Sequence, residues 1–91
     1  MTIKVSCAPA AGGHECQVEV SDNKSVSRHS VVVNAKDLAR WGRGRSADEL
    51  VRRSFEFLLQ REPKESILRE FDLALIQRYF PEFDGLMTKR S

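Results

Sequence analysis

The sequence predicts an α+β fold in which a three-stranded antiparallel β-meander, residues 1–33, is packed on one face by three to four helices within 34–83. Apolar and polar residues alternate through the first third of the chain, which is typical of strands that bury one face. After residue 34 the apolar residues recur every three or four positions, which is typical of amphipathic helices. With 91 residues, 41% of them apolar, the chain is expected to form a single domain at 1–83, followed by a flexible tail at 84–91.

The alternation also predicts how the strands pair. The residues expected to face the core are Ile3, Val5, Cys7, Cys16, Val18, Val20, His29, Val31 and Val33. A slip of one residue would turn all of these side chains toward the solvent, so the register is strongly constrained. We expect Cys7 to pair with Cys16, and Val18 to pair with His29. The Pro- and Gly-containing segment 8–14 and the polar segment 21–25 are expected to connect the strands.

Capping residues predict the first two helices. Asn34 is a favourable N-cap for a short helix from 35 to about 41. Ser46 and Glu49 have the spacing of a capping box, in which a hydroxyl and a carboxylate three residues apart bind each other's backbone N–H groups. This capping box predicts that the longest helix of the chain spans about 47–61.

The longest predicted helix has a wide apolar face. At roughly 100° per residue, its apolar side chains cover an arc of about 200°. These side chains belong to Leu50, Val51, Phe55, Phe57, Leu58 and Leu59. One sheet face covers about half of such an arc, so we expect C-terminal helices or another molecule to cover the remainder. Such helices are predicted at 64–71 and, after the capping residue Asp72, at 73–80, with Pro81 ending the second.

Two stretches of the helical part carry a resemblance. The segment from Glu49 to Leu73 reads ELVRRSFEFLLQREPKESILREFDL, and RYFPEF follows it at 78–83. Both resemble a group of short uncharacterised bacterial proteins, and the resemblance extends to the strand that bears His29 and to the segment 37–40. It implies a bacterial or phage-related source and a compact α+β unit. It implies no catalytic residue, because no function is attached to that group.

Composition excludes some classes of protein. The net charge of +2 is too small to identify a partner. No apolar run approaches the roughly 18 residues that a membrane span requires, and the start of the chain lacks the apolar block of a signal peptide. We therefore expect a cytoplasmic protein with no membrane partner, in which Cys7 and Cys16 stay reduced.

Cys7, Cys16 and His29 have the residue types of zinc ligands, and His14 lies in the expected loop between the two cysteines. Their spacing matches no standard zinc motif, since the sequence has neither Cys-x-x-Cys nor His-x₃₋₅-His. The alternative is that both cysteines are small core residues and that His29 is half-buried with a backbone hydrogen-bond partner. We favour that alternative and expect no metal or other cofactor.

A basic segment around Trp41 has the composition of a nucleic-acid-binding surface, because guanidinium groups contact phosphates and an aromatic ring stacks on bases. Its residues continue onto the longest predicted helix and are Arg40, Trp41, Arg43, Arg45, Arg52 and Arg53. Against this interpretation, nearby carboxylates reduce the positive potential, and a pI near 8.7 is below that of a strongly basic domain. The alternative is a solvated loop beside a salt-bridged helix, with Trp41 covering the edge of the core.

No pattern in the sequence predicts catalysis. The chain has no Walker motif, no Gly-x-Gly-x-x-Gly loop and no nucleophile elbow, and its carboxylates are scattered. We therefore expect a protein that is not an enzyme and has no small-molecule substrate.

Protein contact is the working hypothesis. The aromatic-rich C-terminal part supplies the expected interface residues Phe71, Tyr79, Phe80 and Phe83. The alternative is that these side chains close an intramolecular core. An open edge strand, 2–7 or 27–34, offers a second route by strand addition. The sequence thus favours a protein-binding or regulatory module that acts on a partner or as a homodimer, with nucleic-acid association as the second hypothesis.

Overall fold

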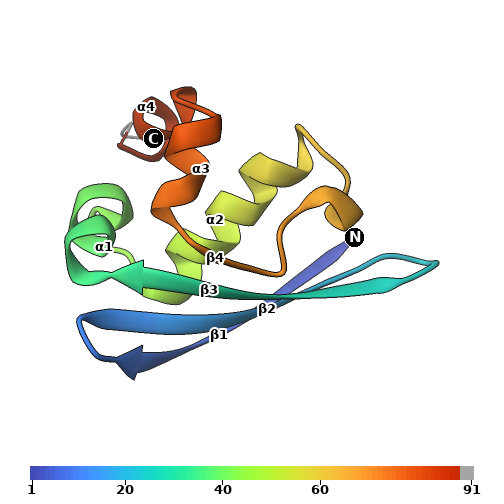
Figure 1. Ribbon diagram of the computed structural model, residues 1–91, viewed down its shortest axis with the longest axis horizontal. Coiled ribbons are helices and arrows are strands. Elements are labelled where there is room, and N and C mark those ends of the chain that lie inside the picture. Colours follow the sequence, from blue (N-terminus) through green and yellow to red (C-terminus); the bar gives the residue numbers. More distant parts are fainter. Residues whose placement is uncertain (89–91) are drawn as a thin grey trace.

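A twisted sheet forms one layer of the molecule, and Figure 1 shows all of the helices on one side of it. The computed structural model describes residues 1–88. The strands are β1 (Thr2–Ala10), β2 (Gly13–Ser21), β3 (Val26–Asn34) and β4 (Glu70–Asp72). The helices are α1 (Ala35–Gly42), α2 (Ala47–Leu59), α3 (Ala74–Tyr79) and α4 (Glu82–Thr88), with a 3₁₀ turn, η1 (Lys64–Ser66), between α2 and β4. The fold is therefore α+β, as predicted.

The register of the first three strands confirms the pairing predicted from the alternation. Cys7 pairs with Cys16, and Val18 pairs with His29, in an antiparallel β1-β2-β3 meander. The first connection is shorter than the predicted loop at 8–14, because β1 and β2 continue to Ala10 and from Gly13. A Cβ atom on Gly13 would lie 2.1 Å from the carbonyl oxygen of Val33, so only glycine fits this close approach.

The fourth strand, β4, corrects two predictions. It pairs in parallel with β3 over Ser30–Val32, so the sheet has four strands in the order β1-β2-β3-β4. The helix predicted at 64–71 is wrong, since only η1 is helical in that segment. The edge of β3 provides the reason, because the backbone N–H of Ser30 donates to Arg69 O at 2.6 Å and that edge would otherwise lack partners. The edge predicted at 27–34 is thus covered over Ser30–Val32, whereas β1 remains an outer strand.

The caps of α1 and α2 confirm the predicted helix starts. The Asn34 side chain accepts a hydrogen bond from the backbone N–H of Asp37 at 2.8 Å, and the Ser46 hydroxyl accepts one from that of Glu49 at 3.2 Å. Helix α2 ends at Leu59, two residues before the predicted end. Within residues 1–88, no helix has the length and apolar character needed to cross a membrane.

The wide apolar arc of α2 is covered from two sides. Phe55 is buried with its ring 5.2 Å from that of His29 on the sheet. On the other side, the Phe57 ring meets those of Phe80 and Phe83 at 5.9 and 5.3 Å between centroids, in edge-to-face geometry. The expectation that C-terminal elements complete the cover of this helix is therefore confirmed.

The predicted flexible tail at 84–91 is wrong over 84–88, where the chain forms α4. Phe83 and Met87 on this helix are buried, and the backbone N–H of Asp84 donates to the Gln77 side chain at 2.8 Å. Pro81 marks the end of α3, but proline also suits the first turn of a new helix, where its missing N–H costs nothing. Residues 89–91 of the predicted tail lie outside the described residues.

Candidate functional site

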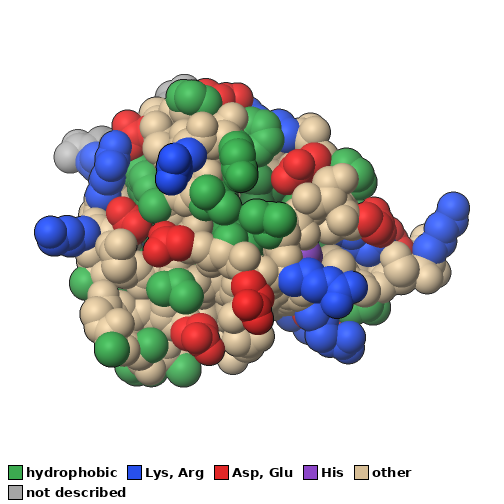
Figure 2. Space-filling model, in the orientation of Figure 1, with side chains coloured by type: hydrophobic (Ala, Val, Ile, Leu, Met, Phe, Trp, Pro, Cys, Tyr) green, Lys and Arg blue, Asp and Glu red, His purple; other side chains and the backbone are tan. Residues whose placement is uncertain are grey.

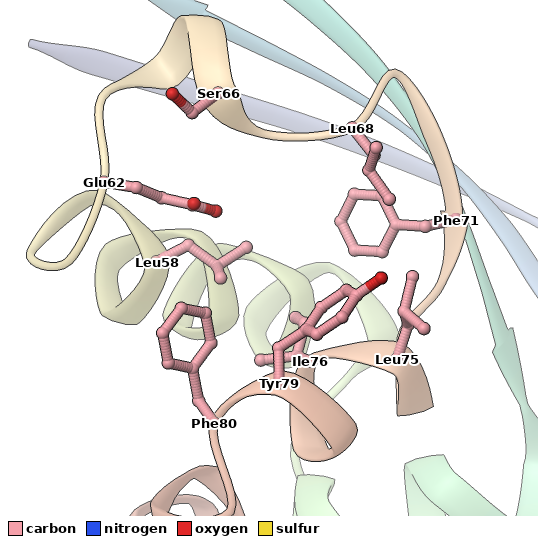
Figure 3. Close-up of a pocket in the computed structure, with 9 residues that line it drawn as sticks. All are labelled: Leu58, Glu62, Ser66, Leu68, Phe71, Leu75, Ile76, Tyr79 and Phe80. Atoms are coloured by element: carbon pink, nitrogen blue, oxygen red, sulfur yellow. The ribbon is translucent and has the colours of Figure 1, made fainter.

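An apolar pocket of about 380 Å³ lies between the end of α2, the segment from η1 to β4, and α3. Figure 3 shows its walls converging from these three parts of the chain. Its lining residues are Leu58, Glu62, Ser66, Leu68, Phe71, Leu75, Ile76, Tyr79 and Phe80. The pocket exists because α2 ends at Leu59 and the chain then leaves the helix to reach the edge of β3, so no helix fills this side of α2.

Large apolar side chains at the pocket rim are exposed to water. Leu68 is 50% exposed and Tyr79 is 67% exposed, while Leu58 and Ile76 form a buried floor. Figure 2 shows hydrophobic side chains gathered on this face, over α3 and toward η1. Contiguous exposed apolar surface beside a hollow is typical of a contact site for another molecule.

Three of the four predicted interface residues come together at this pocket. Phe71 reaches it from β4, and Tyr79 and Phe80 reach it from the end of α3. The prediction is wrong for Phe83, which is fully buried and packs edge-on against Trp41 with ring centroids 5.1 Å apart. Leu68 was missed, because a helix at 64–71 would have placed it among the core residues.

Glu62 gives the otherwise apolar pocket a negative charge. It is half-buried, its backbone N–H donates to Leu58 O at 2.9 Å, and its side chain points into the pocket in Figure 3. Among the ion pairs of residues 1–88, none includes Glu62. The pocket therefore combines apolar walls with one carboxylate that has no cationic partner in the described chain.

An ion cluster around the buried Lys64 holds the segment that forms one wall of the pocket. Lys64 is only 4% exposed, and its ammonium donates to Asp22 Oδ2 at 2.9 Å, to Ser25 Oγ at 2.6 Å and to the Glu65 carboxylate. The hydrogen bond from Lys64 lowers the pKa of Asp22, as do the backbone N–H groups of Lys24 and Ser25. Hydrogen bonds to Glu65 and Asp22 raise the pKa of Lys64. The cluster thus ties η1 to the turn between β2 and β3.

The basic segment does not present its aromatic ring to a ligand. Trp41 is 1% exposed, and its indole Nε1–H donates to Asp84 Oδ1 at 2.8 Å. The alternative interpretation of Trp41, as a residue that covers the edge of the core, is therefore confirmed. Arg40 pairs with the same carboxylate at 2.7 Å. The hydrogen bond from Trp41, followed by the charge of Arg40, lowers the pKa of Asp84.

The other basic residues of this segment do not form one continuous surface. Arg45 lies 3.8 Å from the Glu49 carboxylate, and Arg52 donates to the carbonyl oxygen of Ile3 on β1. Arg43 is exposed in a left-handed conformation at the end of α1, with φ of 52°. Arg53 is half-buried on α2. A nucleic-acid strand would therefore meet a few separated guanidinium groups without a stacking ring.

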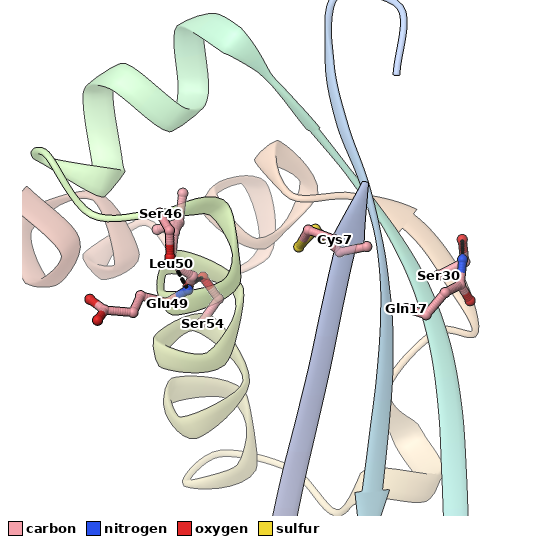
Figure 4. Close-up of a disulfide and its surroundings, with 8 residues drawn as sticks. Cys7, Gln17, Ser30, Ser46, Glu49, Leu50 and Ser54 are labelled. Carbon is pink, nitrogen blue, oxygen red and sulfur yellow. Dashed lines mark hydrogen bonds between the residues drawn. A yellow bond between two sulfur atoms is a disulfide. The ribbon is translucent and has the colours of Figure 1, made fainter. Parts of the chain in front are cut away.

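The two cysteines form a disulfide, so the expectation that they stay reduced is wrong. Cys7 and Cys16 face each other across β1 and β2 with Cα atoms 4.0 Å apart, and both point toward the core. Figure 4 shows the sulfur atoms on the face turned toward α2, with Gln17 and Ser30 on the opposite face. Two cysteines that pair directly on one face of a sheet have their sulfur atoms within bonding distance. The expectation of reduced thiols came from the predicted compartment and took no account of this geometry.

The disulfide also removes the basis of the zinc alternative at Cys7, Cys16 and His29. Zinc binds thiolates, and both sulfur atoms are bonded to each other. The His29 ring is buried, with Nδ1 2.8 Å from Leu68 O and Nε2 2.9 Å from Ser27 Oγ. This confirms the predicted backbone partner. Within residues 1–88, no three His, Cys, Asp or Glu side chains gather as a metal-binding group.

Comparisons of the chain with protein-family models, with curated proteins and with solved structures find no match. The resemblance of residues 49–73 to short bacterial proteins therefore stays a prediction. Any functional conclusion rests on the geometry of the pocket and on its chemistry.

Proposed function

We propose that this chain is a small protein-binding or regulatory module without catalytic activity, and that the pocket between α2, η1 and α3 receives side chains of its partner. The observation that carries this proposal is the juxtaposition of exposed Leu68 and Tyr79 with a preformed apolar hollow. The partner is another protein or a second copy of this chain.

The energetics of the rim support a protein partner. Burying apolar surface contributes roughly 25 cal/mol per Å² before the costs of association, so exposed Leu68 and Tyr79 gain free energy when covered. Tyrosine is also enriched among the residues that dominate binding energy at interfaces. Nucleic-acid association, the second hypothesis, has less support because Trp41 is buried and Arg40 and Arg45 have carboxylate partners.

The cellular compartment of the protein is also a matter of proposal. A cytoplasmic location stays a prediction, and the disulfide between Cys7 and Cys16 weighs against it, since cytoplasmic thiols are kept reduced. Thiol labelling of the protein, taken from its natural cells with free thiols blocked at lysis, measures which state is present. Unlabelled cysteines indicate an oxidising location, and labelled ones indicate the cytoplasm.

The proposed function is tested by placing a charge at the rim. Leu68→Glu and Leu86→Glu change two exposed leucines, of which only Leu68 lines the pocket. Quantitative pull-downs from the natural source and sedimentation equilibrium should show a partner or a dimer that Leu68→Glu weakens and Leu86→Glu leaves intact. A strictly monomeric chain that retains nothing, or equal effects of both variants, would contradict the proposal.

A further inference from the structure

The two cations that flank Glu62 in the sequence, Arg61 and Lys64, pair with other carboxylates. Arg61 pairs with Glu82 at 3.4 Å and lies over the Phe57 ring, 3.6 Å from its centroid. Lys64 is paired with Asp22 and Glu65 in the ion cluster described above. Within residues 1–88, no ion pair includes Glu62, although it is half-buried and points into the pocket.

Covering this pocket with a wholly apolar surface would bury an unpaired carboxylate. Such burial is strongly unfavourable unless the group is neutralised or paired. A partner that brings its own cation avoids that cost. The aromatic rings of Tyr79 and Phe80, on the wall formed by α3, add a second attraction for a cation through their electron-rich faces.

We propose that the pocket binds a peptide segment of a partner protein in which a Lys or Arg lies beside a bulky apolar residue. The apolar side chain enters between Leu58, Phe71 and Ile76, and the basic side chain pairs with Glu62. The volume of about 380 Å³ is in the range of pockets that take more than one small group. A polypeptide suits the site because Leu68 and Tyr79 extend the apolar surface beyond the pocket itself. This inference rests on the protein-binding function proposed above and specifies the chemistry of the partner.

The test is selection from a random peptide library displayed on phage, with the immobilised oxidised chain as the target. Selected peptides should carry Lys or Arg next to a bulky apolar residue. Their affinity should fall about tenfold with Glu62→Gln, because the basic side chain then meets a neutral acceptor and the attraction between opposite charges is lost. Replacing the basic residue of the peptide by Ala should weaken binding similarly, and both changes together should cost little more than either alone. Glu15→Gln, an exposed carboxylate on β2, is the matched control and should leave the affinity unchanged.

The outcomes separate this inference from the proposed function. Purely apolar peptides that bind the wild-type chain, depend on Tyr79 and ignore Glu62→Gln would overturn the cation pairing while leaving protein binding intact. A dimer formed through the pocket and unaffected by Glu62→Gln would overturn it in the same way. If no selected peptide depends on Leu68 or Tyr79, both proposals fail. Circular dichroism of each variant confirms that the fold is retained.

Discussion

Reducing the disulfide should lower the stability of the fold by an amount that its loop size determines. Cys7 and Cys16 are nine positions apart, so the bond closes a short loop in the unfolded chain. The chain-entropy relation for a loop of this length gives about 2.6 kcal/mol at 25 °C. Domains of this kind are stable by about 5–15 kcal/mol, so the loss is a large fraction of the total.

Urea unfolding with and without a phosphine reductant measures this loss. With slopes of about 1–3 kcal/mol per molar urea, the midpoint should fall by about 1–3 M on reduction. Reduction is preferable to substitution because Cys16 is fully buried and a serine there would add its own penalty. The variant Cys7→Ser, which has no disulfide, is the control, and the reductant should not move its midpoint.

An unchanged midpoint in the wild-type chain would refute this reasoning. It would mean that the β1-β2 hairpin is equally constrained in the unfolded state without the bond, or that the bond is absent. A loss far above 3 kcal/mol would show that the disulfide also supports packing between β1 and α2.

Further predictions concern the ion cluster, the core and a helix cap. Because Lys64 and two backbone N–H groups lower the pKa of Asp22 below its ordinary value of 3.8, its contribution to stability is present above about pH 4 and lost as pH falls through the lowered pKa. Urea titrations at a series of pH values should therefore show that the free energy of unfolding falls more steeply with acid for the wild type than for Asp22→Asn. Phe83→Ala should destabilise the fold by about 3–5 kcal/mol and Tyr79→Ala by less than about 0.5 kcal/mol, and similar losses would contradict the core and rim assignments. Ser46→Ala should cost about 1 kcal/mol through the lost cap, and no change in thermal midpoint would count against that hydrogen bond.

Much of the sheet could be predicted because its determinants are local. The alternation around Val5 and Val18 defines one buried face, and a period of two leaves a single register that keeps both residues inside. The N-caps Asn34 and Ser46 could be predicted for a similar reason, since the hydroxyl or amide acts on a backbone group only three residues away.

The fourth strand could not be predicted because its cause is not local. The spacing of Ile67, Leu68 and Phe71 suits a helix. The free edge of β3 instead forms backbone hydrogen bonds with this segment, which holds it in an extended conformation. The Lys64 cluster depends in the same way on Asp22, 42 positions away in the sequence. Nothing in the sequence around Lys64 or Asp22 indicates that the two side chains meet.

The candidate site was predictable in part. Tyr79 and Phe80 belong to an aromatic-rich stretch, which marks a contact surface whether the contact is internal or external. Which of these aromatic residues face outward depends on α4, whose burial of Phe83 removes that ring from the surface. Glu62 has no distinguishing neighbour in the sequence, and its place in the pocket follows only from the path of the chain between α2 and β4.

Photo-crosslinking from inside the natural cells tests most directly whether the pocket receives a partner. A benzophenone amino acid replaces Tyr79 at the rim in one strain and Leu86 on α4 in another, with and without Leu68→Glu. We predict a discrete crosslinked product from position 79 that Leu68→Glu abolishes, and little product from position 86. Equal products from the two positions, or a product from position 79 that persists with Leu68→Glu, would contradict the assignment of this pocket as the binding site.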